Sequence, residues 1–496
     1  MPTFATTPLG TLVGQRDQGV AVFRGVEYAL PPTGERRFAP PVPMPPWHFQ
    51  RDAGWNGAIA PQTPSRLAPA MGDFTRRMDE DCLTLTIWTP EPDGARRPVL
   101  VWLHGGAWVS GAGSLDWYDG ARIAHEADMV VVAVNYRLGA LGWLKHPALP
   151  ADDLGALDQM EALRWVQANI AAFGGDPGCI TLMGQSAGAA CIGRLLADPR
   201  ASPLFHRAIL QSGGFGRAPL SLAEAYVIGA QVIRAAGLDP DAPDILERLR
   251  TVPFETLLAA TGTVAREGAR FAETNPPFMP TTPEPMTQAE LFAAIAAGAR
   301  EGGGAGKQIL IGATHDEVHA FFASNPAMRE PDWTAAAKRF ADLARRPDAM
   351  ARYKARRPGG TLMDWLADLV SDHTFLWPTM RLAETLAASG VPTQAYQFDW
   401  TPQGNPFRAC HCIELPFVFG NFTQWPAAGM LQGGDAAEMD GLSAIIRRCW
   451  ASFARTGDAA LPELPWPGYE AQHRRTMVFD AVCRVAGDPA GLDSRA

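Results

Sequence analysis

Residues 180–188 read Ile-Thr-Leu-Met-Gly-Gln-Ser-Ala-Gly. The first four residues predict a short buried strand, and the Ala-rich stretch after Gly188 predicts a helix. Between them, the pattern Gly-x-Ser-x-Gly is typical of a nucleophile elbow, a sharp strand-to-helix turn that exposes its serine. Both glycines lack a Cβ atom, so the chain can turn tightly around Ser186. We therefore predict that Ser186 is a nucleophile at the carboxyl end of a strand.

The alternation of strand and helix continues on both sides of this turn. Short apolar runs predict strands at residues 83–88, 99–103, 129–134, 208–211, 308–311 and 394–400. Apolar or Ala-rich spacing predicts helices at residues 158–173, 221–236, 334–353 and 379–389. Strand–helix–strand alternation favours an α/β fold, with a large, mostly parallel central sheet flanked by helices. No polar linker divides the chain, so we expect residues 1–496 to form a single domain with helical insertions.

Composition excludes several classes of protein. The chain has 496 residues, of which 47% are hydrophobic and 19% charged, as in globular proteins. The net charge of -9 argues against a nucleic-acid partner, which needs clustered Lys and Arg. No apolar run reaches about 18 residues, and the first residues lack the pattern of a signal peptide, so we expect no membrane partner. Seven cysteines are too few for a disulfide scaffold, which favours a cytoplasmic enzyme and leaves its oligomeric state open.

A second group of small residues follows the strand at 99–103. His104-Gly105-Gly106-Ala107 stands where this kind of fold places an oxyanion loop. Small side chains allow backbone N–H groups to approach a reacting carbonyl and to stabilise the charge that develops on its oxygen. The backbone N–H of Ala187, directly after the nucleophile, is the second predicted donor.

In this fold the acid and the base follow the nucleophile along the chain, in that order. Asp316 and Glu317 follow the strand at 308–311, and their spacing does not choose between them. The candidate bases are His319, His373, His411 and His473. His411 lies in the loop after the strand at 394–400, where the base is expected, and His373 is the second choice.

Several further motifs stand in a consistent order along nearly the whole chain. They are Glu-Asp-Cys-Leu-Thr-Leu at 80–85, Asn-Tyr-Arg-Leu-Gly at 135–139, Phe-Gly-Gly-Asp-Pro at 173–177 and Glu-Leu-Pro-Phe-Val-Phe-Gly at 414–420. Together with the elbow they resemble the type-B carboxylesterase family, the α/β-hydrolases that include cholinesterases and bacterial para-nitrobenzyl esterases. The bacterial esterases are the most similar branch. The resemblance implies the α/β-hydrolase fold, with helical insertions that form a gorge above the nucleophile.

The resemblance also assigns roles to single residues. It implies Glu317 as the acid and His411 as the base, and it implies Gly106, Ala107 and Ala187 as the oxyanion donors. Ser212 resembles a serine that hydrogen-bonds the acid in relatives. Arg37 and Glu80 match a buried ion pair of the family. Trp108, Ala320 and Phe321 are implied as pocket residues, the small Ala320 giving room for a bulky or aryl alcohol.

Some positions depart from the family pattern. Asp153 stands where Asn is usual, and residues 280–283 replace a common run, so we expect local changes in hydrogen bonding. Ala60 replaces a cysteine, which leaves Cys82 without its usual disulfide partner.

These features predict a serine ester hydrolase that acts through an acyl-enzyme on small to medium esters, including aryl and bulky-alcohol esters. This chemistry needs no metal and no organic cofactor. Cys410-His411-Cys412 has the residue types of a metal site. We do not expect it to bind a metal, because three consecutive residues of an ordinary loop cannot all point at one ion. Two other functions remain open. One is amide or carbamate hydrolysis by the same triad, and the other is a non-catalytic scaffold or adhesion role.

Overall fold

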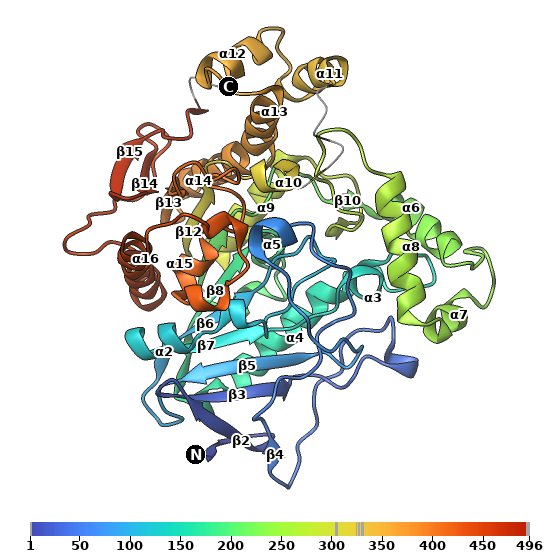
Figure 1. The fold of residues 1–496 in the computed structure, drawn as a ribbon. Helices are drawn as coiled ribbons and strands as arrows, with labels where there is room; N and C mark the ends of the chain where they lie inside the picture. Colours follow the sequence, from blue (N-terminus) through green and yellow to red (C-terminus); the bar gives the residue numbers. More distant parts are fainter. Residues whose placement is uncertain (1, 303–305, 324, 326–327, 329–331, 493–496) are drawn as a thin grey trace.

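A large twisted sheet runs through the centre of the molecule (Figure 1). The computed structural model describes residues 2–302, 306–323, 325, 328 and 332–492. In spatial order the strands are β1 (Pro2–Thr7), β2 (Gly10–Asp17), β3 (Val20–Glu27), β5 (Thr84–Thr89), β7 (Val130–Val134), β6 (Arg97–Leu103), β8 (Gly175–Gln185), β9 (Arg207–Gln211), β12 (Gln308–Thr314), β13 (Thr393–Phe398), β14 (Arg475–Phe479) and β15 (Arg484–Gly487). The seven strands from β7 to β14 pair in parallel, and both edges are antiparallel. The predicted mostly parallel sheet is confirmed.

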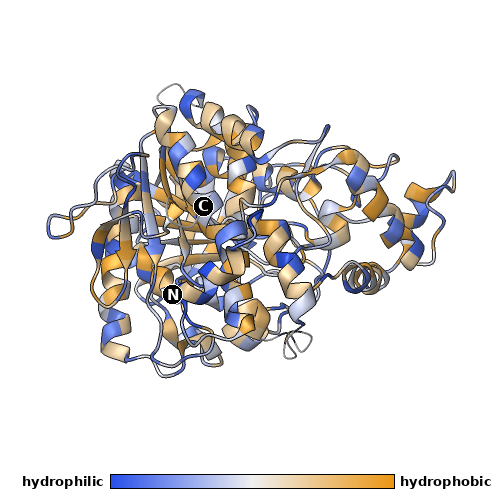
Figure 2. Cartoon of the chain, turned by 90° about the horizontal axis from the view of Figure 1, so that it is seen from above, coloured by the Kyte–Doolittle hydropathy of each residue, from blue (hydrophilic) through white to orange (hydrophobic). Residues whose placement is uncertain are grey.

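Both faces of the sheet are covered, which explains the continuous apolar runs in central strands such as β6 and β7. Along β6, Val99, Val101 and Leu103 belong to one buried cluster, whereas Leu100 and Trp102 belong to another on the opposite face. Strand side chains alternate between faces, so a strand buried on both sides reads as a continuous apolar run. Figure 2 shows the hydrophobic colour gathered on these inner strands and on the helix faces that lie against them.

The helices form layers on the sheet and two lobes beyond it (Figure 1). They are α1 (Ala68–Met71), α2 (Ala121–Ala127), α3 (Gly139–Trp143), α4 (Leu154–Asn169), α5 (Ala187–Ala197), α6 (Leu222–Ala235), α7 (Ile245–Thr251), α8 (Phe254–Glu267), α9 (Gln288–Glu301), α10 (His319–Ala323), α11 (Trp333–Ala344), α12 (Ala349–Arg356), α13 (Leu362–Ser371), α14 (Trp377–Ala388), α15 (Leu415–Phe419) and α16 (Ala436–Thr456). One face packs against α4, α5, α9 and α14, and the other against α2 and α16. One lobe contains α6–α8 and the other α11–α13, each with a buried cluster of its own. Within the described residues, no helix combines the length and hydrophobicity needed to cross a bilayer.

The predicted helix at 334–353 is wrong as a single element. The structure has two helices there, α11 and α12, separated by residues 345–348. Arg345 adopts a left-handed conformation with φ of 51°, and Pro347 follows it. A left-handed residue ends a helix, and a proline close behind cannot continue it. The Ala-rich composition predicted helix correctly but not this break.

Smaller elements differ from their predictions in their limits. The helix predicted at 158–173 starts earlier, at Leu154, and its last residues 170–173 form a 3₁₀ turn. The proline-rich segment 274–286, for which no element is predicted, contains one short strand, β11 (Thr281–Thr282), which pairs with β10 (Leu220–Ser221). β4 (Arg51–Asp52) pairs with β2 at the sheet edge.

Arg37 and Glu80 form the ion pair that the resemblance implied, with 2.7 Å between Nε and Oε2.

The parallel register brings the functional loops to one edge of the sheet. Leu103 pairs with Gly184, Gln185 with Gln211, and Gln211 with Gly312, so these strands end at one level. In open α/β sheets, sites form beyond the carboxyl ends of the strands. The loops that follow β6, β8, β9, β12 and β13 carry the predicted catalytic groups.

Candidate active site

Ser186 lies at the tip of a tight turn between β8 and α5. Its backbone has φ 57° and ψ -124°, which a non-glycine residue rarely adopts and which marks a strained turn. A Cβ atom at Gly188 would lie 2.0 Å from the carbonyl oxygen of Leu103, and one at Gly184 would lie 2.8 Å from the backbone of Gly188. The two glycines therefore let α5 approach the sheet closely enough to hold the serine at this tip.

The loop after β6 lies directly beside the serine. A Cβ atom at Gly105 would lie 3.0 Å from Cβ of Ser186. Gly106 has φ of 117°, and its carbonyl oxygen accepts hydrogen bonds from the backbone N–H groups of Val109 and Ser110. This small turn fixes the direction of the peptide groups that follow β6.

Three backbone N–H groups near Ser186 have no acceptor within the part of the chain that the structure describes. They belong to Gly106, Ala107 and Ala187. Ala187 is the first residue of α5, where N–H groups have no partner inside the helix and carry the positive end of its dipole. Donors of this kind are suited to an oxyanion.

His411 and Glu317 form a buried pair. The imidazole Nδ1–H donates to Glu317 Oε2, and Glu317 Oε1 also accepts from the backbone N–H of Thr314 at 2.9 Å. The backbone N–H of His411 donates to the carbonyl oxygen of Glu317 at 3.1 Å. Because Nδ1 carries the proton, Nε2 keeps the lone pair that a general base needs.

Ser186 and His411 line the same cavity, which has a volume of about 380 Å³. Its wall is largely apolar and includes Leu67, Met71, Phe74, Leu115, Trp117 and Tyr118. A cavity of this size and character holds a small or medium organic ligand.

Gln185, the residue before Ser186, contacts His411, and sequence reasoning missed this contact. Its side-chain amide donates to His411 Nε2 at 3.2 Å. The only signal in the sequence was its place next to Ser186, which does not reveal where the side chain points.

The other candidates for acid and base lie elsewhere. Asp316 pairs with Arg357, with 2.7 Å between Oδ1 and Nη2, and not with His411. His319 is buried among carboxylates, and His473 pairs with Glu470 at the surface.

His373 is not placed as a base either. It packs edge-on against Trp377 with ring centroids 4.7 Å apart, and burial lowers its pKa to about 4.

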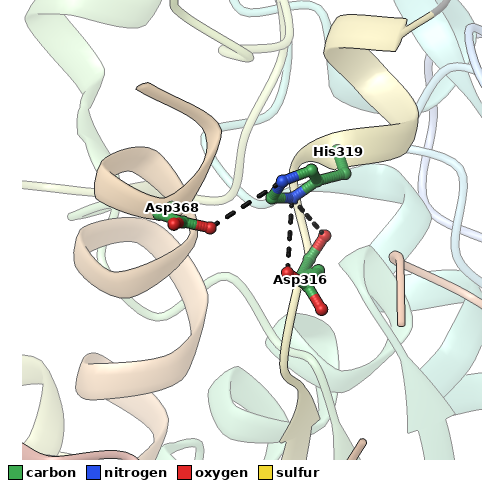
Figure 3. Close-up of side chains that lie close together, drawn as sticks. All are labelled: Asp316, His319 and Asp368. Carbon is green, nitrogen blue, oxygen red and sulfur yellow. Dashed lines mark hydrogen bonds and ion pairs between the residues drawn. The ribbon is translucent and has the colours of Figure 1, made fainter. Parts of the chain in front are cut away.

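Asp316, His319 and Asp368 converge between the acid loop and α13 (Figure 3). His and Asp side chains in this arrangement are possible metal ligands. Arg357, however, bridges the two carboxylates, with Nη2 at 2.7 Å from Asp316 and 2.8 Å from Asp368. Burial alone would raise the pKa of Asp316, but the adjacent His315, His319 and Arg357 hold it well below its usual range. The cluster is therefore an ion-pair network that ties the helical lobe to the loop carrying Glu317.

Cys410 and Cys412 lie on either side of His411, and among the described residues they do not belong to a converging group of His, Cys, Asp and Glu side chains. Both side chains are buried, and burial raises the pKa of each thiol well above its usual range. Neither thiol is therefore predisposed to act as a nucleophilic thiolate.

The hydrogen bond implied between Ser212 and the acid is absent from this structure. The Ser212 hydroxyl is buried and has no partner among the described residues, although its backbone N–H donates to the carbonyl of Gly312 at 2.8 Å. Its left-handed backbone, with φ of 51°, sets the side-chain direction, which no sequence pattern predicts.

Of the three predicted pocket residues, only Phe321 lines the cavity, with its ring 5.4 Å from that of His411. Ala320 is fully buried, because consecutive helix residues point about 100° apart and it turns away from the cavity on α10. Trp108 is also buried: its indole N–H donates to Cys191 Sγ at 3.2 Å, and its ring packs near Trp143. The expectation that Ala320 and Trp108 line the pocket is therefore corrected.

Two of the noted departures from the family pattern meet in space. Asp153 accepts from the backbone N–H of Thr281 at 2.8 Å and from its hydroxyl at 2.9 Å. Lys145 lies 3.0 Å from the same carboxylate. The segment 280–283 lines a separate cavity and not the one that holds Ser186.

The sheet, the elbow and the loops at its carboxyl edge define an α/β-hydrolase. The model of the carboxylesterase family matches residues 2–486, and the chain belongs to this family. It is 37% identical to phenmedipham hydrolase of Pseudarthrobacter oxydans, over 99% of this chain and 97% of that protein. It is 34% identical to para-nitrobenzyl esterase of Bacillus subtilis, over 98% and 96% of the two chains. The solved structure of a thermophilic PNB esterase matches with a TM-score of 0.85 and 32% identity, over 99% of both chains.

Proposed function

We propose that the chain hydrolyses carboxylic esters through Ser186, His411 and Glu317. The observation that carries this proposal is the placement of Ser186 on a strained tip in the same cavity as His411, whose Nδ1–H is bonded to Glu317. A serine, a base and a group that orients the base are the parts that nucleophilic acyl transfer requires.

The reaction proceeds in two steps. Ser186 Oγ attacks the ester carbonyl carbon while His411 Nε2 takes the hydroxyl proton, and Glu317 stabilises the resulting imidazolium. The backbone N–H groups of Gly106, Ala107 and Ala187 bind the tetrahedral oxyanion. The C–O bond to the alcohol then breaks, and His411 gives its proton to the leaving oxygen. Water, activated by the same base, hydrolyses the acyl-enzyme and releases the acid.

The predicted substrates are small to medium esters, including aryl esters and esters of bulky alcohols. A cavity of about 380 Å³ with an apolar wall is consistent with this size, and a neutral acyl or aryl group gains free energy by leaving water. Residues 1–496 act as one domain in this proposal. The proposed location is the cytoplasm, since all seven cysteines are free and this suits a reducing compartment.

Hydrolysis of para-nitrophenyl acetate, butyrate and octanoate tests the function. We expect turnover by the unaltered enzyme and none above background by Ser186→Ala. The control variant is Ser389→Ala, which changes a serine at the end of α14, and it should keep full activity. A fluorophosphonate probe should add its mass to the peptide containing Ser186. If the esters are inert and the corresponding para-nitroanilides are cleaved, the enzyme is an amidase. If neither class reacts, a non-catalytic role replaces this proposal.

A further inference from the structure

A second cavity adjoins the cavity that contains Ser186. Its volume is about 300 Å³, and that of the cavity with Ser186 is about 380 Å³. Among the described residues, four line both cavities: Met71, Phe74, Leu115 and Trp117. These four residues form a shared wall that stands between the two spaces.

Two of the four residues in the shared wall are aromatic, and their rings contact each other. Phe74 and Trp117 meet edge to face, with ring centroids 5.3 Å apart. Trp117 also stacks on Trp425, with centroids 4.8 Å apart, and Trp425 lines the second cavity but not the one with Ser186. Aromatic pairs in these geometries are more favourable than burial of their area alone. The rings therefore close the shared wall at this point.

Polar contacts join the same two segments on the side of the second cavity. Arg76, two residues after Phe74, forms an ion pair with Asp116, the residue before Trp117. Arg76 and Asp116 line the second cavity and not the one with Ser186. The side-chain amide of Asn421 donates to the carbonyl oxygens of Asp116 and Trp117, at 3.0 and 2.9 Å. These contacts hold the segments that carry the two rings against each other.

The far side of the second cavity is exposed, whereas much of the shared wall is buried. Asp73, Thr75 and Thr423 line this cavity and are exposed, but Leu115 and Trp117 are only 3% and 7% exposed. A methylene group of a substrate adds to binding only where it can leave water. A long chain that meets the closed wall therefore gains nothing from the space behind it.

We propose that Phe74 and Trp117 determine the size of the ester that the enzyme accepts. Their closed wall restricts the cavity with Ser186 to short chains, and it shuts off a space that would otherwise take the end of a longer chain. This inference deepens the proposed esterase function and rests on it, because the substrate that is measured by the wall is the ester that Ser186 attacks.

Two pairs of esters test the role of the shared wall. Para-nitrophenyl octanoate and acetate differ in the acyl chain, and octyl acetate and ethyl acetate differ in the alcohol chain. Both pairs are needed because either end of an ester can point at the wall. The measured quantity is kcat/KM for the long ester divided by kcat/KM for the short one, since this ratio cancels any general loss of activity.

In Phe74→Ala the ratio should rise about tenfold in at least one pair, because loss of the ring joins the two cavities and gives the added methylene groups room. Phe74 is partly exposed, so this change leaves no cavity in the deep core. Phe74→Trp, which keeps a large ring in the wall, should retain the ratio of the unaltered enzyme. The control Trp55→Ala removes an exposed ring that lines neither cavity and should also retain it.

A double variant tests where the longer chain goes. Thr423 lines the second cavity and not the one with Ser186, so Thr423→Trp should fill the second cavity alone. The gain of Phe74→Ala should disappear in Phe74→Ala/Thr423→Trp, whereas Thr423→Trp by itself should leave the ratio unchanged. An unchanged ratio in Phe74→Ala for both pairs, or a gain that Thr423→Trp does not remove, overturns this inference while leaving the esterase function in place. Hydrolysis of none of the four esters by the unaltered enzyme overturns both.

Discussion

The two halves of the candidate active site are built in different ways. The nucleophile half comprises the turn at Ser186 and the loop at Gly105–Ala107, and close backbone packing next to single strands fixes its shape. The acid–base half joins two loops from distant parts of the chain. The backbone N–H of Asp316 donates to the carbonyl of Ala409, and that of His411 donates to the carbonyl of Glu317.

An ion-pair network stabilises the acid–base half of the site, whereas the nucleophile half contains no ion pair among the described residues. Asp316 stands next to Glu317, and Arg357 links Asp316 to Asp368 on α13. The acid loop is thereby tied to a helical lobe. A short motif is thus enough to place Ser186, whereas the orientation of His411 depends on contacts between remote segments. The following predictions test this difference.

The largest effect is expected at Ser186. Replacement by Ala should lower kcat by about 10⁶, as removal of the nucleophile does in other serine hydrolases. The melting temperature should stay the same or rise, because Ala does not disturb the packing of the turn. Residual activity within tenfold of the unaltered enzyme would disprove the role of Ser186.

The second effect concerns the choice of acid. Glu317→Gln should lower kcat/KM by about 10⁴, because the amide no longer fixes the tautomer of His411 or stabilises its charged form. The control Glu284→Gln, at an exposed position, should be fully active. If Asp316→Asn abolished activity while Glu317→Gln retained it, the acid would be Asp316.

The third prediction tests the backbone packing of the nucleophile half. Gly106→Ala should lower kcat by about 10²–10³, the loss expected when an oxyanion donor is displaced. At this position φ is 117°, and an added Cβ would lie 1.9 Å from the carbonyl oxygen of Ser110. The control Gly94→Ala meets no atom within 4 Å and should behave like the unaltered enzyme. Equal kinetics of the two variants would contradict the proposed loop.

The fourth prediction tests the support of the acid–base half. Arg357→Ala leaves the buried Asp316 and Asp368 without their shared partner, so unfolding should become easier by about 2–3 kcal/mol. The kcat should fall about tenfold with little change in KM, because the base is mispositioned and the cavity wall is untouched. Arg357→Lys should recover part of the lost stability and part of the lost kcat. Arg352→Ala, an exposed change on α12, is the control. A stability loss with unchanged kcat would show that the network does not position the acid.

The smallest effect concerns pH. Burial, and then the nearby Glu317 carboxylate, raise the pKa of Glu414 to about 8 from its ordinary value of 4.5. Between these pH values the folded protein keeps a proton that the unfolded chain has lost, so this group makes stability decline as pH rises. Glu414→Gln should flatten the decline in melting temperature between pH 5 and 8. Parallel curves for the two proteins would mean that Glu414 is ionised in the folded state.

The sequence by itself determined the class of fold and predicted the nucleophile. A strand, a serine between two glycines and a helix are contiguous, so local patterning is enough to predict the elbow. Apolar runs predicted the central strands, because a sheet covered on both faces needs them. The choice of Glu317 over Asp316 came only from family resemblance, since adjacent residues in a loop carry no periodic signal.

Only the tertiary structure decided which side chains reach the cavity. Ala320 and Phe321 are neighbours in the sequence, yet helix geometry sends one into the core and the other to the cavity. Arg66 and Arg217 are far apart along the chain, yet both donate a hydrogen bond to the carbonyl oxygen of Thr274. Side-chain direction and long-range contact depend on packing, which a linear pattern does not encode.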